Sequence, residues 1–176
     1  DVICMDIDEK KVALLQQGHV SIFEPGLASL VRESLEAKRL QFTTDEKMAV
    51  QHGQVLCIAV GTPSRDDGSA DLSYVMSVGD AVAQYRVQPV LLAEKSPVPV
   101  GTGDTLRAHI DHCLAKTGRV LQFDIVSNPE FLKEGSAVAD CRRPDRIIIG
   151  CERDEVREVM RDLYAPFNRN HDRIMF

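Results

Sequence analysis

The apolar run at residues 55–60, Val-Leu-Cys-Ile-Ala-Val, most limits the folds open to this chain. Its apolar residues are continuous and do not alternate with polar ones. This is typical of a buried strand in a parallel sheet that helices cover on both faces. Shorter strand-like patterns recur along the chain, at residues 2–8, 40–43, 89–93, 122–126, 146–149 and 173–176.

Helical patterns alternate with these strands. Thr44 or Asp45 is placed to cap one of the helices and Asp71 to cap another, and Gly118 to end a third. The regular order of strand, helix and short loop predicts an α/β fold with a doubly wound, mostly parallel sheet. The apolar faces of the longer helices recur at helical spacing, as Leu27, Leu30, Val31 and Leu35, as Leu106, Ile110 and Leu114, and as Val156, Val159, Met160 and Leu163.

Charge and composition exclude several classes of partner. The 176 residues carry a net charge of −6, which argues against nucleic acid or an anionic membrane surface. The apolar runs are too short to span a bilayer, and we expect a cytoplasmic protein. The five cysteines show no CxxC spacing, so we expect reduced thiols, most of them in the core.

An acidic loop follows the strand at residues 122–126. Residues 127–135 read Ser-Asn-Pro-Glu-Phe-Leu-Lys-Glu-Gly and place two carboxylates, Glu130 and Glu134, before a glycine. Ligands of open α/β sheets bind at the carboxyl ends of the strands, so this loop is a candidate ligand contact. A solvated acidic turn is the alternative.

Two further features have open alternatives. Asp6, at the end of the first strand, suits the ribose hydroxyls of a dinucleotide but equally suits the cap of the next helix. The loops after residues 60 and 95 offer the hydroxyls of Thr62, Ser64, Ser96 and Thr102. These hydroxyls suit phosphate binding near helix N-termini, or ordinary turn and cap chemistry.

One helix carries soft metal ligands, His109, His112 and Cys113, together with Asp111. His109 lies three and four residues before the other two, on one helical face. The sequence shows no second cluster to complete a metal shell, so we expect a solvated helix face with Cys113 in the core, and no metal. Nucleophile-elbow, P-loop and zinc-protease motifs are absent from the sequence.

Six motifs, in order along the chain, resemble the UDP-glucose/GDP-mannose dehydrogenase family, and within it the UDP-glucose branch. They include Phe-Glu-Pro-Gly-Leu in the turn that leads into the second helix. They also include Lys-Ser-Pro-Val-Pro-Val-Gly-Thr after the fourth strand pattern. They are distributed across nearly the whole chain, at residues 2–8, 22–27, 59–63, 95–102, 127–135 and 144–150.

The resemblance implies a Rossmann-like NAD-binding domain of an enzyme of polysaccharide biosynthesis. That enzyme oxidises the C6 alcohol of UDP-glucose to a carboxylate, by two hydride transfers to NAD and hydrolysis of an enzyme-bound thioester. By the resemblance, Glu130 helps to activate the hydrolytic water, and the UDP-sugar contacts Glu130, Phe131, Leu132, Lys133 and Glu134. NAD contacts Asp6, Lys11, Val60, Gly61, Thr62, Pro63, Ser64, Ser96, Pro97, Val98 and Glu134.

The sequence departs from the family pattern in three ways. Asp1 opens directly into a strand, so the family's first strand and glycine-rich loop do not appear before it. The family's catalytic cysteine, in a later domain, is not among the five cysteines. Pro97 stands where the family usually has a threonine, which removes a hydroxyl near the hydrolytic water. We therefore expect residues 1–176 to be a portion of the NAD-binding domain, inactive alone, without the family's central helix and UDP-binding domain.

The family's first strand normally lies at the centre of the sheet, between two strands present here. Without it two strand edges face a gap, so we expect the chain to form a homo-oligomer or to be poorly stable. Two alternatives to the UDP-glucose activity stay open. One is a non-catalytic nucleotide-binding or interaction module, and the other is a dehydrogenase of GDP-mannose or another nucleotide sugar.

Overall fold

The computed structural model describes residues 1–168 and 172–176. The chain divides into two compact units, each made of two segments. Unit 1 contains Asp1–Gly53 and Phe131–Asp145, and unit 2 contains Gln54–Glu130 and Arg146–Phe176.

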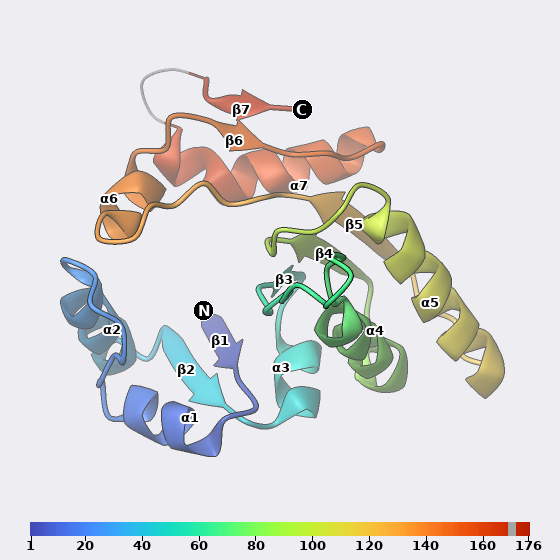
Figure 1. Ribbon diagram of the computed structural model, residues 1–176, viewed down its shortest axis with the longest axis horizontal. Helices are drawn as coiled ribbons and strands as arrows, with labels where there is room; N and C mark the ends of the chain where they lie inside the picture. The colour runs from blue at the N-terminus through green and yellow to red at the C-terminus, as the bar shows by residue number, and fades with distance from the viewer. Residues whose placement is uncertain (169–171) are drawn as a thin grey trace. The chain divides into compact units, whose positions relative to one another are not determined.

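Unit 1 is built on a pair of parallel strands, β1 (Val2–Met5) and β2 (Leu40–Thr43), in which Val2 lies opposite Leu40. Carboxylate caps begin two of its helices, because Asp8 accepts the backbone N–H groups of Lys10 and Lys11, and Asp45 that of Met48. Helices α1 and α2 contact β2, and α3 contacts β1 (Figure 1). The helices of unit 1 are α1 (Glu9–Gln16), α2 (Leu27–Glu36), α3 (Glu46–His52) and α6 (Ala137–Arg142).

Unit 2 is built on a parallel sheet of three strands in the order β3-β4-β5, with β4 in the middle. A second parallel pair joins β6 to β7, and an isolated antiparallel bridge connects Ser127 at the end of β5 with Gly150. The strands are β3 (Val55–Ile58), β4 (Val90–Glu94), β5 (Phe123–Ser127), β6 (Ile147–Ile148) and β7 (Ile174–Met175). The helices are α4 (Ser73–Tyr85), α5 (Thr102–Thr117), α7 (Asp154–Tyr164) and the 3-10 turn Ala165–Phe167.

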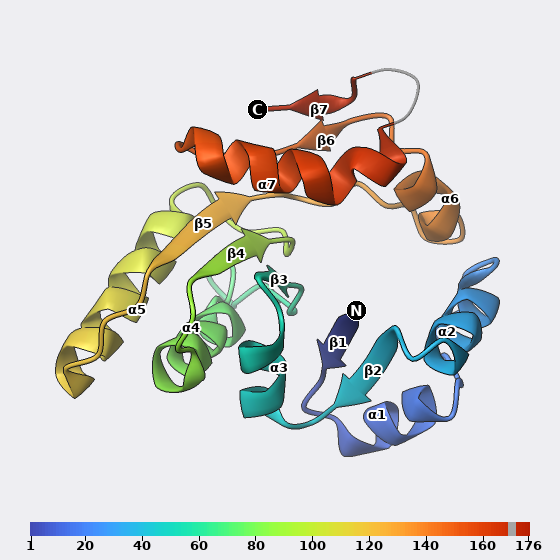
Figure 2. The same cartoon turned by 180° about the vertical axis from the view of Figure 1, so that it is seen from behind.

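The core of unit 2 uses both faces of β4, since all five of its residues are buried. Leu91 and Ala93 pack with Val156 and Met160 of α7. Strand side chains alternate, so Val90 and Leu92 face the opposite side, where α4 and α5 lie side by side (Figures 1 and 2). This two-sided burial is the reason for the continuous apolar sequence of the strand.

The predicted α/β class and parallel strand pairing are confirmed, and most elements lie within two residues of their expected ends. The expectation of a fully buried strand at residues 55–60 is wrong, because Cys57 is exposed. Strand β3 ends the three-stranded sheet and pairs only with β4 among the described residues, which leaves it less covered.

Other details also differ from expectation. The N-cap of α4 is Leu72, although the Asp71 carboxylate still accepts the N–H of Ser73. Helix α6 is not predicted by the sequence pattern, because its six residues contain too few turns to show an apolar period. All five cysteines are free, as expected, but none is buried, so their expected place in the core is wrong. Among the described residues, no helix is both long and apolar enough to cross a membrane.

Helices α4 and α5 approach closely at Gly79. A Cβ atom at this position would lie 2.9 Å from Leu106 Cδ1 and 3.3 Å from Ile110 Cγ1. Both neighbours are fully buried, so neither has room to move away. Glycine is therefore required here by the distance between the helices.

We predict that Gly79→Ala destabilises the protein. Overpacking of a filled core costs about 1–3 kcal/mol, against about 1 kcal/mol gained from the helix propensity of alanine. Gly103→Ala in α5 is the matched control, because its Cβ would meet its nearest atom at an ordinary 3.4 Å. In urea denaturation Gly79→Ala is expected to be less stable than Gly103→Ala by about 1–3 kcal/mol. Equal stability of the two variants would contradict the packing constraint.

Candidate functional site

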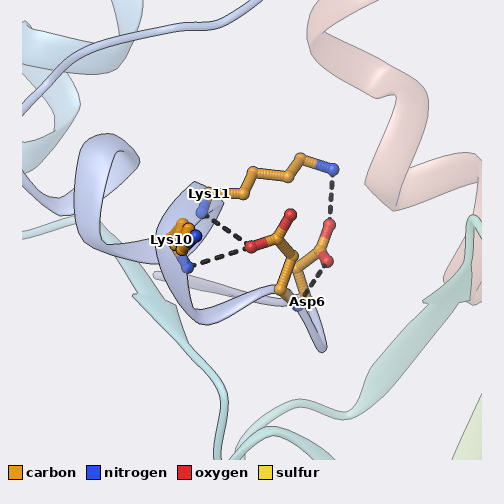
Figure 3. Close-up of polar contacts among 4 residues, drawn as sticks. Asp6, Lys10 and Lys11 are labelled. Atoms are coloured by element: carbon orange, nitrogen blue, oxygen red, sulfur yellow. Dashed lines mark hydrogen bonds and ion pairs between the residues drawn. The ribbon is translucent and has the colours of Figure 1, made fainter.

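Asp6 lies just after the carboxyl end of β1, where its carboxylate is held from two sides (Figure 3). Lys11 Nζ donates to Asp6 Oδ2 at 2.5 Å, and the backbone N–H of Asp8 donates to Asp6 Oδ1 at 3.0 Å. The helix after β1 is capped by Asp8 and not by Asp6. Of the two alternatives open for Asp6, the helix cap is therefore excluded.

The bond from Lys11, followed by that from the Asp8 N–H, lowers the pKa of Asp6 below its ordinary value. The carboxylate is thus ionised at neutral pH. A carboxylate has about four lone-pair positions, and the two bonds above leave others available. With 31% of its side chain exposed, Asp6 can accept hydroxyl groups of a ligand such as a ribose.

The loops that follow β3 and β4 are bonded to each other. Thr62 Oγ1 donates to the carbonyl of Pro97 at 2.8 Å, and Ser96 Oγ to the carbonyl of Val60 at 2.7 Å. The hydroxyl of Thr102 donates to the carbonyl of Pro99 at 2.8 Å. The Thr102 bond is local turn and cap chemistry, the second of the two alternatives, whereas the Thr62 and Ser96 bonds join the two loops.

The interlocked loops contain all the unit 2 residues that the resemblance assigns to NAD. The hydroxyls of Thr62 and Ser96 fix the backbone of both loops, so the groups they leave for a ligand are mainly backbone atoms and exposed side chains. Ser64 lies in a separate antiparallel bridge with Ala70. The residues brought together here are Val60, Gly61, Thr62 and Pro63 after β3, and Ser96, Pro97 and Val98 after β4.

A buried polar cluster lies at the carboxyl ends of β4 and β5. Asn128 is 1% exposed, and its side-chain oxygen accepts the Tyr164 hydroxyl at 2.5 Å and Lys95 Nζ at 3.4 Å. Its side-chain nitrogen donates to the carbonyl of Ile148 at 2.9 Å. The cluster fixes the chain two residues before Glu130. Sequence reasoning missed it, because Asn128-Pro129 indicated only a turn and Tyr164 is distant in sequence.

The acidic loop is divided between the two units. Glu130 is the last residue of its segment in unit 2, whereas the next four residues belong to unit 1. All five side chains are exposed to solvent and therefore accessible to a ligand. The four in unit 1 are Phe131, Leu132, Lys133 and Glu134.

Within unit 1, the carboxylate of Glu24 holds the turn that follows Glu134. The N–H of Gly135 donates to Glu24 Oε1 at 2.6 Å, and the N–H of Ala137 to Glu24 Oε2 at 3.0 Å. These amides lie at the start of α6, where a negative charge is favourable. Gly135 has φ of +82°, a conformation that other residues rarely adopt. Glu24 of the motif at residues 22–27 therefore contacts Gly135, the last residue of the motif at residues 127–135.

We predict that Glu24→Gln loosens this turn, because the amide side chain offers one acceptor oxygen where two are used. The expected cost is about 1 kcal/mol, the scale of one hydrogen bond. Amide hydrogen exchange of Gly135 and Ala137 should accelerate several-fold. Glu33→Gln, on the exposed side of α2, is the control. Unchanged exchange in Glu24→Gln would show that the contact does not hold the turn.

Unit 2 also contains a cavity of about 760 Å³ at the edge of β5, between the N-terminal turns of α5 and α7. Val98, Arg107 and Arg153 are among its lining residues. Glu94 reaches it from β4 with only 4% of its surface exposed, and its Oε1 atom has no hydrogen-bond partner among the described residues. Burial raises the pKa of Glu94 above its ordinary value.

We predict that Glu94→Gln changes how stability depends on pH. Above the ordinary pKa of a glutamate, native Glu94 retains its proton while the unfolded chain loses it, so stability falls as pH rises through this window. Glutamine has no proton to lose there. The variant should therefore gain stability relative to the original protein as pH rises from about 4.

Urea denaturation at several pH values measures the difference in the free energy of unfolding between the variant and the original protein. The contributions of other carboxyl groups are present in both proteins and cancel in this difference. The cavity also contains Asp104, Arg107, Asp124, Glu152 and Arg153, which are the same in both proteins. Glu36→Gln, at an exposed position of α2, is the control. Parallel pH curves for Glu94→Gln and the original protein would disprove the effect.

Comparison with known proteins gives consistent matches over nearly all of the chain. The family model for the UDP-glucose/GDP-mannose dehydrogenase family, NAD binding domain, matches residues 1–168. UDP-glucose 6-dehydrogenase from Pseudomonas aeruginosa is 45% identical over 174 residues, which cover 99% of this chain and 38% of that protein. The enzyme of the same name from Rhizobium meliloti is 44% identical over 179 residues, which cover 100% of this chain and 40% of that protein.

A solved structure matches as well. The UDP-glucose dehydrogenase from the hyperthermophilic archaeon Pyrobaculum islandicum is 35% identical, with a TM-score of 0.88 over 99% of this chain and 40% of that one. The present chain thus spans about two fifths of the length of the relatives that it matches.

Proposed function

We propose that the whole protein oxidises UDP-glucose to UDP-glucuronate with NAD, because this chain belongs to the UDP-glucose/GDP-mannose dehydrogenase family as its NAD binding domain. Residues 1–176 then supply much of the NAD-binding domain. The central helix, the UDP-binding domain and the catalytic cysteine come from other parts of the protein.

The observation that carries the proposal is the state of Asp6. It is ionised, partly exposed, and fixed at the carboxyl end of a parallel strand, the location at which α/β sheets bind dinucleotides. In this reading the adenosine ribose hydroxyls donate to the free lone pairs of Asp6, while Lys11 keeps the carboxylate oriented. Replacing Asp6 removes a charged acceptor but no packing.

In the proposed site, the two interlocked loops after β3 and β4 line NAD through residues 60–64 and 96–98, and Glu134 also contacts the cofactor. When bound there, NAD would supply the hydride acceptor for the two oxidation steps. The acidic loop contacts the UDP-sugar through residues 130–134. The buried Asn128 cluster orients the chain entering this loop, so that Glu130 acts as the general base toward the hydrolytic water.

The proposal also includes the assembly and the location of the protein. Strand β3 pairs only with β4 among the described residues, so its other edge is free. An unpaired edge favours association, and we propose that the protein works as a homo-oligomer in the cytoplasm.

The test is NADH formation from UDP-glucose by the full-length protein. Asp6→Asn should raise KM for NAD by about tenfold, the equivalent of one charged hydrogen bond of about 1.4 kcal/mol, with a smaller effect on KM for UDP-glucose. Asp45→Asn, which changes the cap of α3 and lies outside the proposed site, is the control. A protein that forms no NADH from UDP-glucose would overturn the activity, and equal KM values in both variants would overturn the role of Asp6.

Pro97 is the observation that favours a second function, a non-catalytic nucleotide-binding module. Proline has no hydroxyl and no N–H group at the position where the family usually has a threonine. In the same assay Pro97→Thr should increase turnover if thioester hydrolysis limits the rate. NAD binding without any NADH in either protein would favour the non-catalytic module, and NADH from GDP-mannose but not from UDP-glucose would favour the other branch of the family.

A further inference from the structure

Asp80 of α4 faces two potential metal ligands of α5. His109 Nε2 lies 2.7 Å from Asp80 Oδ1, and Cys113 Sγ lies 3.4 Å from the same oxygen and 3.9 Å from His109 Nε2. All three ligand atoms thus lie within 4.8 Å of one another, in the part of the chain that the structure describes. The sequence alone gave only the α5 half of this group.

Two neighbouring helices, α4 and α5, supply the members of this group. His109 and Cys113 are one helical turn apart on α5, so their side chains lie on the same face. Asp80 follows Gly79, at which α4 and α5 approach so closely that a Cβ atom would lie 3.2 Å from His109 Cδ2. The helix packing that requires glycine therefore also brings the carboxylate to the imidazole and the thiol.

The separations suit a small tetrahedral ion. Zinc bonds of about 2.0–2.3 Å place neighbouring ligand atoms about 3.3–3.6 Å apart. The Asp80–Cys113 separation of 3.4 Å already fits, whereas the His109–Asp80 separation has to open from 2.7 Å by about 0.6 Å and the His109–Cys113 separation has to close from 3.9 Å by about 0.3 Å. We propose that Asp80, His109 and Cys113 bind a zinc ion between α4 and α5, with water as the fourth ligand.

The donor set and exposure determine the kind of metal. A carboxylate oxygen, an imidazole nitrogen and a thiolate sulfur are all zinc ligands, whereas Mg²⁺ and Ca²⁺ prefer oxygen alone. The side chain of Asp80 is 59% exposed and that of His109 is 32% exposed, so an ion and a water molecule can reach the group from solvent. The site lies within unit 2 and uses none of the residues assigned to NAD or the UDP-sugar.

A nucleophilic cysteine is the competing explanation, and the geometry opposes it. A general base needs one imidazole nitrogen toward the thiol and the other toward an orienting carboxylate. Here the same atom, His109 Nε2, faces both Asp80 and Cys113.

Metal binding requires only the loss of one proton from the protein. Without metal, the Cys113 thiol keeps its proton and donates a hydrogen bond to Asp80 Oδ1. When the ion binds, the S–H bond breaks, a zinc–sulfur bond forms, and the proton passes to solvent. No oxidation or reduction is involved.

The experiment uses purified, reduced protein after chelation of bound metals, titrated with Zn²⁺ against a chromogenic chelator and separately with Co²⁺. We expect one zinc ion per chain at the tight site and a thiolate-to-cobalt charge-transfer absorption band. Cys113→Ser should abolish this band. Cys113→Ser, His109→Ala and Asp80→Asn should each weaken zinc binding at least about tenfold, because even outer-shell changes commonly cost 10- to 100-fold.

His112→Ala and Cys151→Ser are the matched controls, since neither residue belongs to the group. Both should retain tight binding, and circular dichroism verifies that every variant is folded. Zinc binding that is equally tight in Cys113→Ser and His109→Ala, or an absorption band that Cys151→Ser removes, would overturn the proposal. Absence of tight zinc binding by the original protein would overturn it as well. Because NADH formation is measured separately, failure of the metal site and failure of the proposed enzyme function are distinguishable.

Discussion

One buried side-chain amide connects most of unit 2. Asn128 donates through its backbone to the carbonyl of Glu94 and through its side chain to that of Ile148, which joins β4, β5 and β6. Its side-chain oxygen accepts a hydrogen bond from the hydroxyl of Tyr164, at the end of α7. A buried polar group costs about 1–3 kcal/mol when a partner is lost. Because breaking these hydrogen bonds would be costly, they hold the loop that begins at the carboxyl end of β5 in one position. The proposed chemistry takes place in this loop.

Unit 1 depends on the same principle with charged acceptors. Asp8 caps α1, Asp6 accepts an N–H and a lysine, and Glu24 accepts two amides at the start of α6. Each carboxylate satisfies donors that a loop or a helix end leaves unpaired. The acidic residues that give the chain its charge of −6 are thus in part structural. Asp6 and the carboxylates of the acidic loop also keep exposed surface for a ligand.

Helix packing explains why a metal site can arise where no motif indicates one. Gly79 sets the approach of α4 and α5 for reasons of packing, and the neighbouring Asp80 is then carried to His109 and Cys113. The proposed zinc ion would bond the two helices on the side of the sheet opposite α7. It would therefore add stability to unit 2 without taking part in the proposed oxidation.

The sequence by itself determined the α/β class, the order of the elements and the family, because these follow from local apolar spacing and from loop motifs that each lie within a few residues. It also predicted Gly118 as the end of α5 and a cap at Thr44 or Asp45, of which the structure shows Asp45. Only the tertiary structure decided which polar groups meet. Glu24 and Gly135 are 111 residues apart, and Tyr164 and Asn128 are 36 apart. No local pattern encodes such pairs, because side chains distant in sequence are brought together only when the strands and helices pack.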